Sequence, residues 1–530
     1  MGHFPYNQIR QRVLLTRKHV SFQTPHYFFK PMNTREIVST ATYLASTKPA
    51  FLLSELRTYL AGDVPLHELH RTLAPHLRRL GLAATEVDGD FRISIIEKHA
   101  AYILNAYERT RIDAFLAASH IPAALERAIE DYITKKVGKR WDDPLILERL
   151  RRAVVAQKDD YWKPSQRRRL QYTKGYRVLS YLAYHFPVYF MQTGHLLAML
   201  ARDGLLKKSM TVLDAGTGPG VIPLAIADFY SRLDAATATV YSVERSEEHI
   251  GAFMFLREQC TQKGAPASIK PPVMSDITAF DPAQIPQRVD LLIFSNVINE
   301  LIDHSLEQRA DLVMKYAEQL SPDGSILIIE PAEETSSTQL RMLSLALKKR
   351  GLTIYSPCSF IWRTNCTPDR CWSFVTAPSI MPTRVMETLA ACDEPFRYVN
   401  TDIKYSYVML RKDGKTRETY YVSAGLRVLR LSQIHRHVDT RVNIIAAKMS
   451  EDLGNAKTHM FRLCDGSAEK PVYAVVPAYH ITIGNEGIVS APYGSILELD
   501  NVLVRYNKAH DAYNLLVTRD TRVSFPKLGG

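Results

Sequence analysis

A glycine-rich turn at residues 212–220 constrains the fold of this chain more than any other stretch. Its sequence, Val-Leu-Asp-Ala-Gly-Thr-Gly-Pro-Gly, follows a short apolar run and precedes the apolar segment 221–227. This order predicts a strand, a tight turn and a helix. Glycine lets the backbone turn sharply and approach a ligand closely. The pattern therefore predicts the first βα unit of a nucleotide-binding α/β domain.

The spacing of the glycines narrows the choice of ligand. The pattern is G-x-G-x-G, which differs from the dinucleotide fingerprint G-x-G-x-x-G, and no Gly-Lys-Ser/Thr of a P-loop follows. It is similar to the loop of S-adenosylmethionine (SAM) methyltransferases, where the preceding acid faces the amino-acid part of SAM. An α/β turn without a ligand is the alternative. The candidate SAM-binding residues of this stretch are Asp214, Gly216, Thr217, Gly218 and Gly220.

Further candidates lie at the ends of later strand-like runs. One run ends at Glu244, where a carboxylate can accept hydrogen bonds from both ribose hydroxyls. Another ends at Asp276, a position expected near the adenine. The apolar run 289–295 is typical of a buried parallel strand and leads to Asn296. With its alternating strands and helices, the region predicts an α/β fold, a seven-stranded Rossmann-like SAM methyltransferase domain. Glu244, Asp276 and Asn296 are its further SAM-binding candidates.

The segment after the fourth strand is expected to face the transferred methyl group. It offers Asn296, Asn299 and Glu300 as candidate catalytic residues. Methyl transfer mainly requires positioning of the nucleophile, with a base only where the acceptor loses a proton. The segment has neither an Asp/Asn-Pro-Pro-aromatic motif nor a cysteine, which weighs against amino methylation of bases and against a covalent cytosine-C5 mechanism. A helix cap and a surface acid are the alternative roles for Asn299 and Glu300.

Four domains are expected. Three helices and a hairpin with an Asp-Gly turn suggest a winged helix, a module that contacts nucleic acid or protein. Short strand-like runs near the C-terminus suggest a small β domain. The predicted domains are a winged-helix-like N-terminal domain at 1–110, a helical basic region at 111–208, the methyltransferase domain with a cysteine-rich insertion at 209–415, and the β-rich domain at 416–530.

The charge of the chain favours an acidic partner. The formal net charge is +12, and segment 161–177 carries six basic residues, four aromatic residues and no acid. Basic groups contact phosphates and aromatic rings stack on unpaired bases, so we expect RNA contact here. A solvated helix face is the alternative.

The sequence also predicts where the protein acts. It has no signal-peptide-like start and no apolar stretch of about 18 residues, so we expect a cytoplasmic location and no membrane partner. The oligomeric state is left open.

Six cysteines suggest a metal or redox role for some of them. Cys358, Cys366 and Cys371 give C-x7-C-x4-C, and Cys464 lies in the β-rich region. Four thiolates can hold zinc or an iron–sulfur cluster, although the spacing matches neither tight zinc pairs nor the ferredoxin run. If Cys464 joins the other three, the site links the β domain to the methyltransferase domain. The other two cysteines, Cys260 and Cys392, are interpreted as ordinary thiols.

Four signatures resemble one known family. They are Phe-Pro-Val-Tyr-Phe at 186–190, the loop at 214–220, Ile329-Glu330-Pro331 with the later Arg341, Gly351 and Pro357-Cys358, and Cys366, Cys371 and Cys464-Asp465-Gly466. Over about residues 180–470 the chain resembles the methyltransferase-like proteins of the mitochondrial small ribosomal subunit and their bacterial and archaeal relatives.

The resemblance implies a factor that binds the small ribosomal subunit or its RNA during assembly. It also implies a [4Fe–4S] cluster on Cys358, Cys366, Cys371 and Cys464, with zinc as the alternative. Two details depart from the family. Ser359 follows the first cysteine where the family has Cys-Pro-His, and Cys371-Trp372 stands where it has Trp-Cys, which displaces the third ligand by one position.

These observations together predict a SAM-dependent methyltransferase acting on small-subunit ribosomal RNA or in ribosome assembly. One alternative is a catalytically inactive assembly factor that binds SAM and RNA. Another is a methyltransferase for a protein or a small molecule, for which the basic surface would be incidental.

Overall fold

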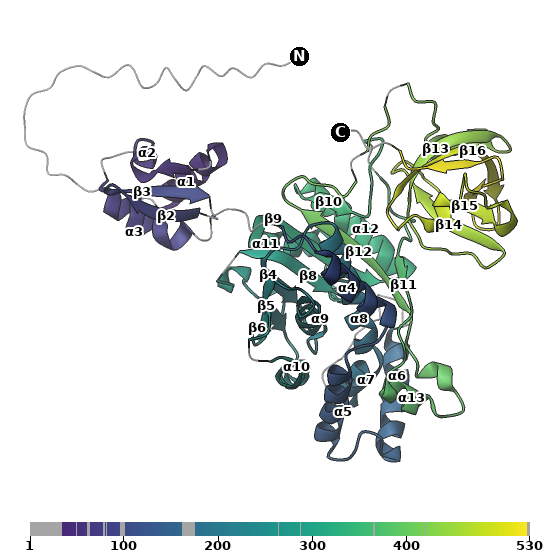
Figure 1. The fold of residues 1–530 in the computed structure, drawn as a ribbon, viewed down its shortest axis with the longest axis horizontal. Helices are drawn as coiled ribbons and strands as arrows, with labels where there is room; N and C mark the ends of the chain where they lie inside the picture. The colour runs from purple at the N-terminus through teal and green to yellow at the C-terminus, as the bar shows by residue number, and fades with distance from the viewer. Residues whose placement is uncertain are drawn as a thin grey trace, which may run out of the picture. The chain divides into compact units, whose positions relative to one another are not determined.

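The computed structural model forms two compact units, Met1–Ile95 and Ile96–Gly530, which are described separately (Figure 1). The predicted boundaries after residues 110, 208 and 415 stay predictions. Most of the predicted RNA-contacting segment, residues 162–174, lies outside the described part of the chain. The structure describes residues 34–48, 50–60, 64–77, 80, 82–95, 101–161, 175–262, 264–286, 288–363, 366–418, 420–423 and 425–526.

The first unit combines three helices with a three-stranded antiparallel sheet of order β1-β3-β2. Asp88 and Gly89 both have positive φ, as a two-residue hairpin turn requires. Leu69, Leu73 and Leu77 bury one face of α3. The predicted winged-helix arrangement is therefore confirmed. Its elements are α1 (Thr34–Thr47), β1 (Ala50–Leu52), α2 (Leu53–Arg57), α3 (Leu66–Leu77), β2 (Leu82–Val87) and β3 (Asp90–Ile95).

Five helices open the second unit. They are α4 (Ala106–Ala118), α5 (Ala123–Val137), α6 (Pro144–Tyr161), α7 (Tyr176–Tyr184) and α8 (Phe186–Arg202). Helix α8 is apolar over most of its surface, and it shares one hydrophobic core with β4 and α9. This packing holds α7 and α8 close to the central sheet.

The central sheet of this unit has the strand order β10-β12-β9-β8-β4-β5-β6. Strand β12 runs antiparallel to β9 and β10, and the other pairs along this order are parallel. This is the mixed seven-stranded sheet of SAM methyltransferases, so the predicted fold class is confirmed. The strands are β4 (Ser209–Ala215), β5 (Thr237–Glu244), β6 (Ala267–Ile269), β8 (Val289–Ser295), β9 (Leu320–Pro331), β10 (Thr353–Ser356) and β12 (Ile403–Arg411).

Two short strands and two layers of helices complete this region. Helices on one face share a core with α8, and helices on the other face form a second core. The chain leaves β4 for β5 and then crosses to β8 on the other side of β4, which is the switch point where such sheets bind ligands. The remaining elements are β7 (Val273–Met274), β11 (Val375–Ala377), α9 (Val221–Tyr230), α10 (Glu247–Cys260), η3 (Pro282–Gln284), η4 (Ile298–Glu300), α11 (Leu306–Ala317), α12 (Glu334–Lys349), α13 (Arg384–Ala390) and η5 (Pro395–Arg397).

The C-terminal strands form a small barrel, drawn in yellow tones in Figure 1. Its order is β13-β14-β15-β17-β16, closed by pairing of β13 with β16. Only β15 and β17 pair in parallel, which gives the strand order of an OB fold. The predicted small β domain is thus confirmed as a barrel. Its elements are η6 (Leu431–His437), β13 (Arg441–Lys448), β14 (Thr458–Cys464), β15 (Val472–Pro477), η7 (Ala478–His480), α14 (Gly487–Ser490), β16 (Ile496–Asn507), β17 (Ala512–Leu516) and β18 (Arg522–Ser524).

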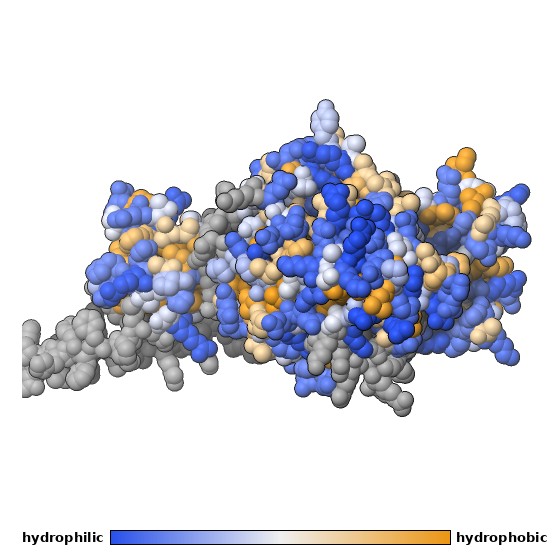
Figure 2. Space-filling model, turned by 90° about the horizontal axis from the view of Figure 1, so that it is seen from below, coloured by the Kyte–Doolittle hydropathy of each residue, from blue (hydrophilic) through white to orange (hydrophobic). Residues whose placement is uncertain are grey.

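The visible surface is mostly hydrophilic. Figure 2 shows hydrophobic side chains on one face in small separate patches. In the described part of the chain, no helix combines the length and apolarity needed to cross a membrane.

Candidate functional site

The turn after β4 has a backbone that only glycine adopts without strain. Gly216, Gly218 and Gly220 have φ of +81°, +56° and +87°. A Cβ on Gly220 would lie 2.1 Å from the ring of Phe253, and one on Gly216 would lie 2.6 Å from Cγ2 of Val297. Positive φ therefore favours glycine at all three positions. Close packing requires it in addition at Gly216 and Gly220.

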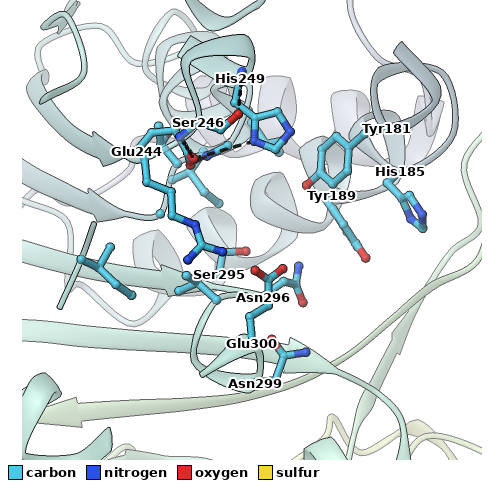
Figure 3. Close-up of a pocket in the computed structure, with 18 of the residues that line it drawn as sticks. Tyr181, His185, Tyr189, Glu244, Ser246, His249, Ser295, Asn296, Asn299 and Glu300 are labelled. Carbon is cyan, nitrogen blue, oxygen red and sulfur yellow. Dashed lines mark hydrogen bonds and ion pairs between the residues drawn. The ribbon is translucent and has the colours of Figure 1, made fainter. Parts of the chain in front are cut away.

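This turn borders a cavity of about 130 Å³ at the carboxyl ends of the strands. Most of the predicted SAM-binding and catalytic residues line it, as Figure 3 shows in part. Gly220 and Asp214 are not among the lining residues, since Gly220 begins α9 and Asp214 lies beneath the turn. The predicted residues that the cavity brings together are Gly216, Thr217, Gly218, Glu244, Asp276, Asn296, Asn299 and Glu300.

Glu244 ends β5 with its carboxylate fixed at the rim of the cavity. Its two oxygens accept hydrogen bonds from the backbone N–H groups of Gly218 and Ser246, both at 2.8 Å. The His249 ring lies 3.9 Å from the carboxylate. Burial alone would raise the pKa of Glu244, but these hydrogen bonds and His249 outweigh it and lower the pKa. Glu244 is therefore an anion at neutral pH, with its carboxylate exposed to a ligand in the cavity.

Asp276 is held differently, by the turn that follows it. The Thr278 N–H and hydroxyl donate to Asp276 at 2.9 and 2.7 Å, and Arg245 donates at 3.3 Å. Burial would raise the pKa of Asp276, but these donors lower it. The side chain is therefore ionised and oriented before any ligand binds.

Asp214 is the most completely buried acid of the site, with 0% exposure. Neither of its carboxylate oxygens has a hydrogen-bond partner of normal geometry among the described residues. Burial raises the pKa of Asp214 to about 7, the nearby Thr217 hydroxyl lowers it in part, and the charge of Glu244 raises it again. A buried acid without partners is costly, so a cationic or hydrogen-bonding ligand group would stabilise it.

Helices α7 and α8 supply a further wall of the cavity. Tyr181, His185 and Tyr189 lie together on the side away from Glu244 (Figure 3). The His185 and Tyr189 rings are stacked with centroids 5.7 Å apart. Burial, and then the charge of Lys158, lower the pKa of His185 to about 4, so its imidazole is neutral at neutral pH. The sequence predicts that residues 185–190 lead into a helix in front of the glycine turn, and α8 confirms this. The side chains of Tyr181, His185 and Tyr189 were not predicted as site residues.

The floor of the cavity leads to a second buried acid. Asn296, with φ of +52°, follows β8, and the N–H of Asn299 donates to Glu330 Oε1 at 3.2 Å. Among the described residues, Asn299 Oδ1 and Glu330 Oε2 have no hydrogen-bond partner. Burial raises the pKa of Glu330 to about 8, so its carboxyl group is mostly protonated at neutral pH. In the sequence, Glu330 was noted only as part of a family signature and was not predicted as a residue of the site.

The four predicted metal ligands line one small cavity, of about 20 Å³. As they stand, no three His, Cys, Asp or Glu side chains of the described residues are arranged to hold a metal ion. Burial raises the pKa of Cys366 to about 12. The number and chemistry of the four thiols fit a metal site. Their arrangement in this structure is too open to bind an ion. These thiols are Cys358, Cys366, Cys371 and Cys464. Two further free thiols lie elsewhere, the half-buried Cys260 and the exposed Cys392.

A buried arginine completes the cysteine cavity. Arg341 is 1% exposed and donates to the Tyr407 carbonyl at 2.7 Å and to the Tyr493 hydroxyl at 3.3 Å. Its Nε has no partner among the described residues, and no carboxylate pairs with it there. Burial raises the pKa of Cys358, and the charge of Arg341 opposes that shift. Burial therefore keeps these thiols neutral in the absence of a metal, and Arg341 only reduces that effect at Cys358.

A comparison with solved structures found several of low similarity. Three solved structures are similar at low identity. The first is magnesium protoporphyrin IX methyltransferase (ChlM) from Synechocystis PCC 6803 with bound SAH (14% identity, 42% of this chain and 82% of that chain, TM-score 0.26). The others are the plantazolicin methyltransferase BpumL with SAH (12%, 57% and 98%, 0.25) and NSun6 from Pyrococcus horikoshii with SFG (11%, 38% and 48%, 0.24). The fold assignment itself rests on the strand order.

Family models cover most of the chain. Two of them describe the N-terminal and C-terminal domains of DUF8157, a domain of unknown function, and match residues 34–86 and 432–526. A comparison with curated proteins gave no match. A third model, described as Mitochondrial small ribosomal subunit Rsm22, matches residues 175–457. Because that match spans more than half of the 530 residues, the chain belongs to the Rsm22 family.

Proposed function

We propose that this protein binds SAM and transfers its methyl group to small-subunit ribosomal RNA or within a ribosome assembly step. The observation that carries the proposal is the joint position of the glycine turn, Glu244 and Asp276. They lie at the ends of neighbouring strands and line one cavity at the switch point of the sheet. In this assignment Glu244 binds the ribose hydroxyls, Asp276 lies near the adenine, and Asp214 balances the ammonium group of the amino-acid part.

The acceptor is proposed to lie between the floor of the cavity and its aromatic wall. Asn296, Asn299 and Glu300 would position it from one side. Aromatic and imidazole rings face the cavity from the other side. Since positioning is the main requirement of methyl transfer, hydrogen bonds to the acceptor are sufficient unless it must lose a proton.

The burial of Asp214 predicts that SAM affinity depends on pH. Below about pH 7 its carboxyl group is protonated, and an ammonium group favours the carboxylate. The Kd for SAM should therefore fall as pH rises from 5 to 7, by up to about tenfold per pH unit, and then level off. Calorimetry across this range measures the effect.

Asp214→Asn is the matched control for this dependence. It keeps the size of the side chain and removes the titration, so its SAM affinity should be weak and flat with pH. A wild-type Kd that does not change between pH 5 and 7 would refute the role of Asp214. An absence of SAM binding at every pH would refute the proposed function.

The proposed RNA partner rests on the family description, the net charge of +12 and the basic and aromatic composition of segment 161–177. Crosslinking in cells with mapping of the RNA contacts tests the partner. Recovery of small-subunit RNA that also incorporates label from SAM supports the enzyme. RNA recovery and SAM binding without methyl incorporation would favour an inactive assembly factor, and recovery of no ribosomal RNA would favour a protein or small-molecule acceptor.

We further propose that Cys358, Cys366, Cys371 and Cys464 hold a metal centre, a [4Fe–4S] cluster with zinc as the alternative. The support is the convergence of four thiols from distant segments on one cavity beside a buried arginine. Four thiolates are a sufficient ligand set for either centre. When bound, a cluster would supply a redox-active centre and zinc would supply only a structural link. Closure of the site requires the thiols to move closer together.

Metal analysis after anaerobic purification tests this site. With a cluster, the protein should contain iron and show a broad absorbance band at about 400 nm. Cys464→Ala should lose the metal because only three thiolates remain, whereas Cys392→Ala should keep it, since Cys392 is exposed and outside the cavity. A colourless protein that contains zinc identifies the alternative, and a metal-free wild type would overturn the site.

A further inference from the structure

Three cation–π pairs follow one another along residues 360–363, between the cysteines and the barrel. Lys348 Nζ lies 3.5 Å from the ring centre of Phe360, and Arg430 Cζ lies 4.5 Å from that of Trp362. In the third pair the segment supplies the cation instead of the ring, since Arg363 Cζ lies 4.2 Å from the ring centre of Tyr421. The three cations are exposed. In the described part of the chain, none of them has a carboxylate partner.

The backbone beneath these pairs is fixed. The N–H of Val422 donates to the carbonyl of Ile361 at 3.0 Å, and the Ile361 side chain is only 1% exposed. The Asp465 carboxylate accepts from the Trp362 indole at 2.8 Å and from the N–H of Leu431 at 2.9 Å. Segments 360–363 and 420–431 are therefore held together as one surface.

Arg363 adds a sign of functional constraint at this surface. Its backbone has φ of +54°, in the left-handed region that a long side chain rarely adopts. Such strain persists only where the surroundings impose it. The conformation is compatible with the contact between its guanidinium and Tyr421, whose side chain is 46% exposed.

The charge of this surface is predominantly positive, although the half-buried Glu498 lies near Tyr420. Residues 420–438 contain no Asp or Glu, and their exposed basic side chains include Arg427, Arg430 and Arg436. The nearby acid Asp465 is 0% exposed and is engaged by N–H donors. Exposed guanidinium groups next to aromatic rings bind phosphates and stack on unpaired bases. Among the described residues of this surface, the exposed large apolar side chains are Tyr421 and Leu426, fewer than insertion into a lipid surface needs.

We propose that this basic–aromatic surface, formed by residues 360–363 and 420–431 with Lys348, binds single-stranded RNA. The proposal rests on the RNA partner proposed above and assigns a surface to it. The surface lies beside the OB-type barrel, a fold that often binds oligonucleotides. The arginines would contact phosphates, and Tyr421 would stack on a base.

The test is the salt dependence of RNA binding. The triple variant Arg363→Gln, Arg427→Gln and Arg430→Gln removes three exposed charges from this surface. The control removes three from helices α4 and α5, through Arg109→Gln, Arg127→Gln and Lys136→Gln, at positions that are also exposed. The probe is a mixed-sequence single-stranded RNA oligonucleotide, compared with a duplex of the same length, and the full-length chain is used throughout.

The triple variant should bind the single strand at least about tenfold more weakly at low salt. The slope of log Kd against log salt should fall by about 2, because each lost phosphate contact contributes about 0.7 for single strands. Tyr421→Ala should weaken binding without changing that slope. The control should match the wild type in affinity and slope, and circular dichroism should show every variant folded.

Two results would overturn the assignment. One is a triple variant that binds with the affinity and slope of the wild type, and the other is equal binding of single strand and duplex by the wild type. If the wild type binds neither RNA, the proposed RNA partner itself fails, which is a different outcome.

Discussion

Alanine in place of Gly220 is expected to remove SAM binding and to destabilise the fold. Its Cβ would lie 2.1 Å from the Phe253 ring, and φ is +87°. Either the turn or α10 must shift, which costs about 3 kcal/mol in strain and overpacking. A cost of that size within the binding loop corresponds to at least about a hundredfold rise in the Kd for SAM. Calorimetry and denaturant unfolding measure the two effects.

Gly138→Ala is the matched control. Gly138 ends α5 with φ of +68°, but a Cβ there meets no atom within 4 Å. It therefore isolates the backbone penalty, which should lower the free energy of unfolding by about 1 kcal/mol without affecting SAM. If both alanines have the same effect on stability and SAM affinity, the close packing of Gly220 against Phe253 is unimportant.

Replacement of Lys207 by methionine should cause the largest loss of stability. Lys207 is 6% exposed, and its Nζ donates to Asp290 at 2.6 Å and to Asp323 at 2.8 Å. Methionine preserves the apolar stem but leaves two carboxylates without their cation, Asp290 being 5% exposed. Loss of one partner of a buried ion pair costs about 3–5 kcal/mol. Urea unfolding followed by circular dichroism measures this change.

Two further variants test whether the unpaired buried carboxylates cause this loss of stability. Arg152→Met breaks the exposed pair with Glu148 on α6 and should cost less than about 0.5 kcal/mol. Adding Asp290→Asn to Lys207→Met should recover part of the loss, because it removes the most buried uncompensated charge. A Lys207→Met protein as stable as the wild type would show that the triad contributes nothing.

The glycine turn and the main strands could be predicted because their signals are local. Gly216, Gly218 and Gly220 need positive φ, and the acids at the ends of β5 and β7 follow directly from strand boundaries. Asp214 stays a predicted ligand contact; it is fully buried and is not among the residues that line the cavity. Its depth depends on packing that no local pattern records.

The second wall of the cavity could be predicted only as a helix. The sequence places the helix after residues 185–190 in front of the glycine turn. Which side chains face the cavity depends on how α7 and α8 pack against the sheet, so Tyr181, His185 and Tyr189 were not identified. The cysteines posed the same problem, since Cys464 lies far along the chain from Cys371. Their spacing alone left zinc, iron–sulfur and unrelated thiols open, and the family resemblance was needed to group them.

The contact of Arg341 with Tyr493 has a consequence for how the second unit unfolds. Arg341 lies on α12, whereas Tyr493 belongs to the barrel and shares a hydrophobic cluster with Ala447, Met449 and the α8 side of the sheet. The barrel therefore cannot detach without exposing apolar side chains and leaving a buried guanidinium short of hydrogen-bond partners. Sheet and barrel should accordingly lose structure in one cooperative transition, and removal of the barrel would weaken the sheet that carries the SAM cavity.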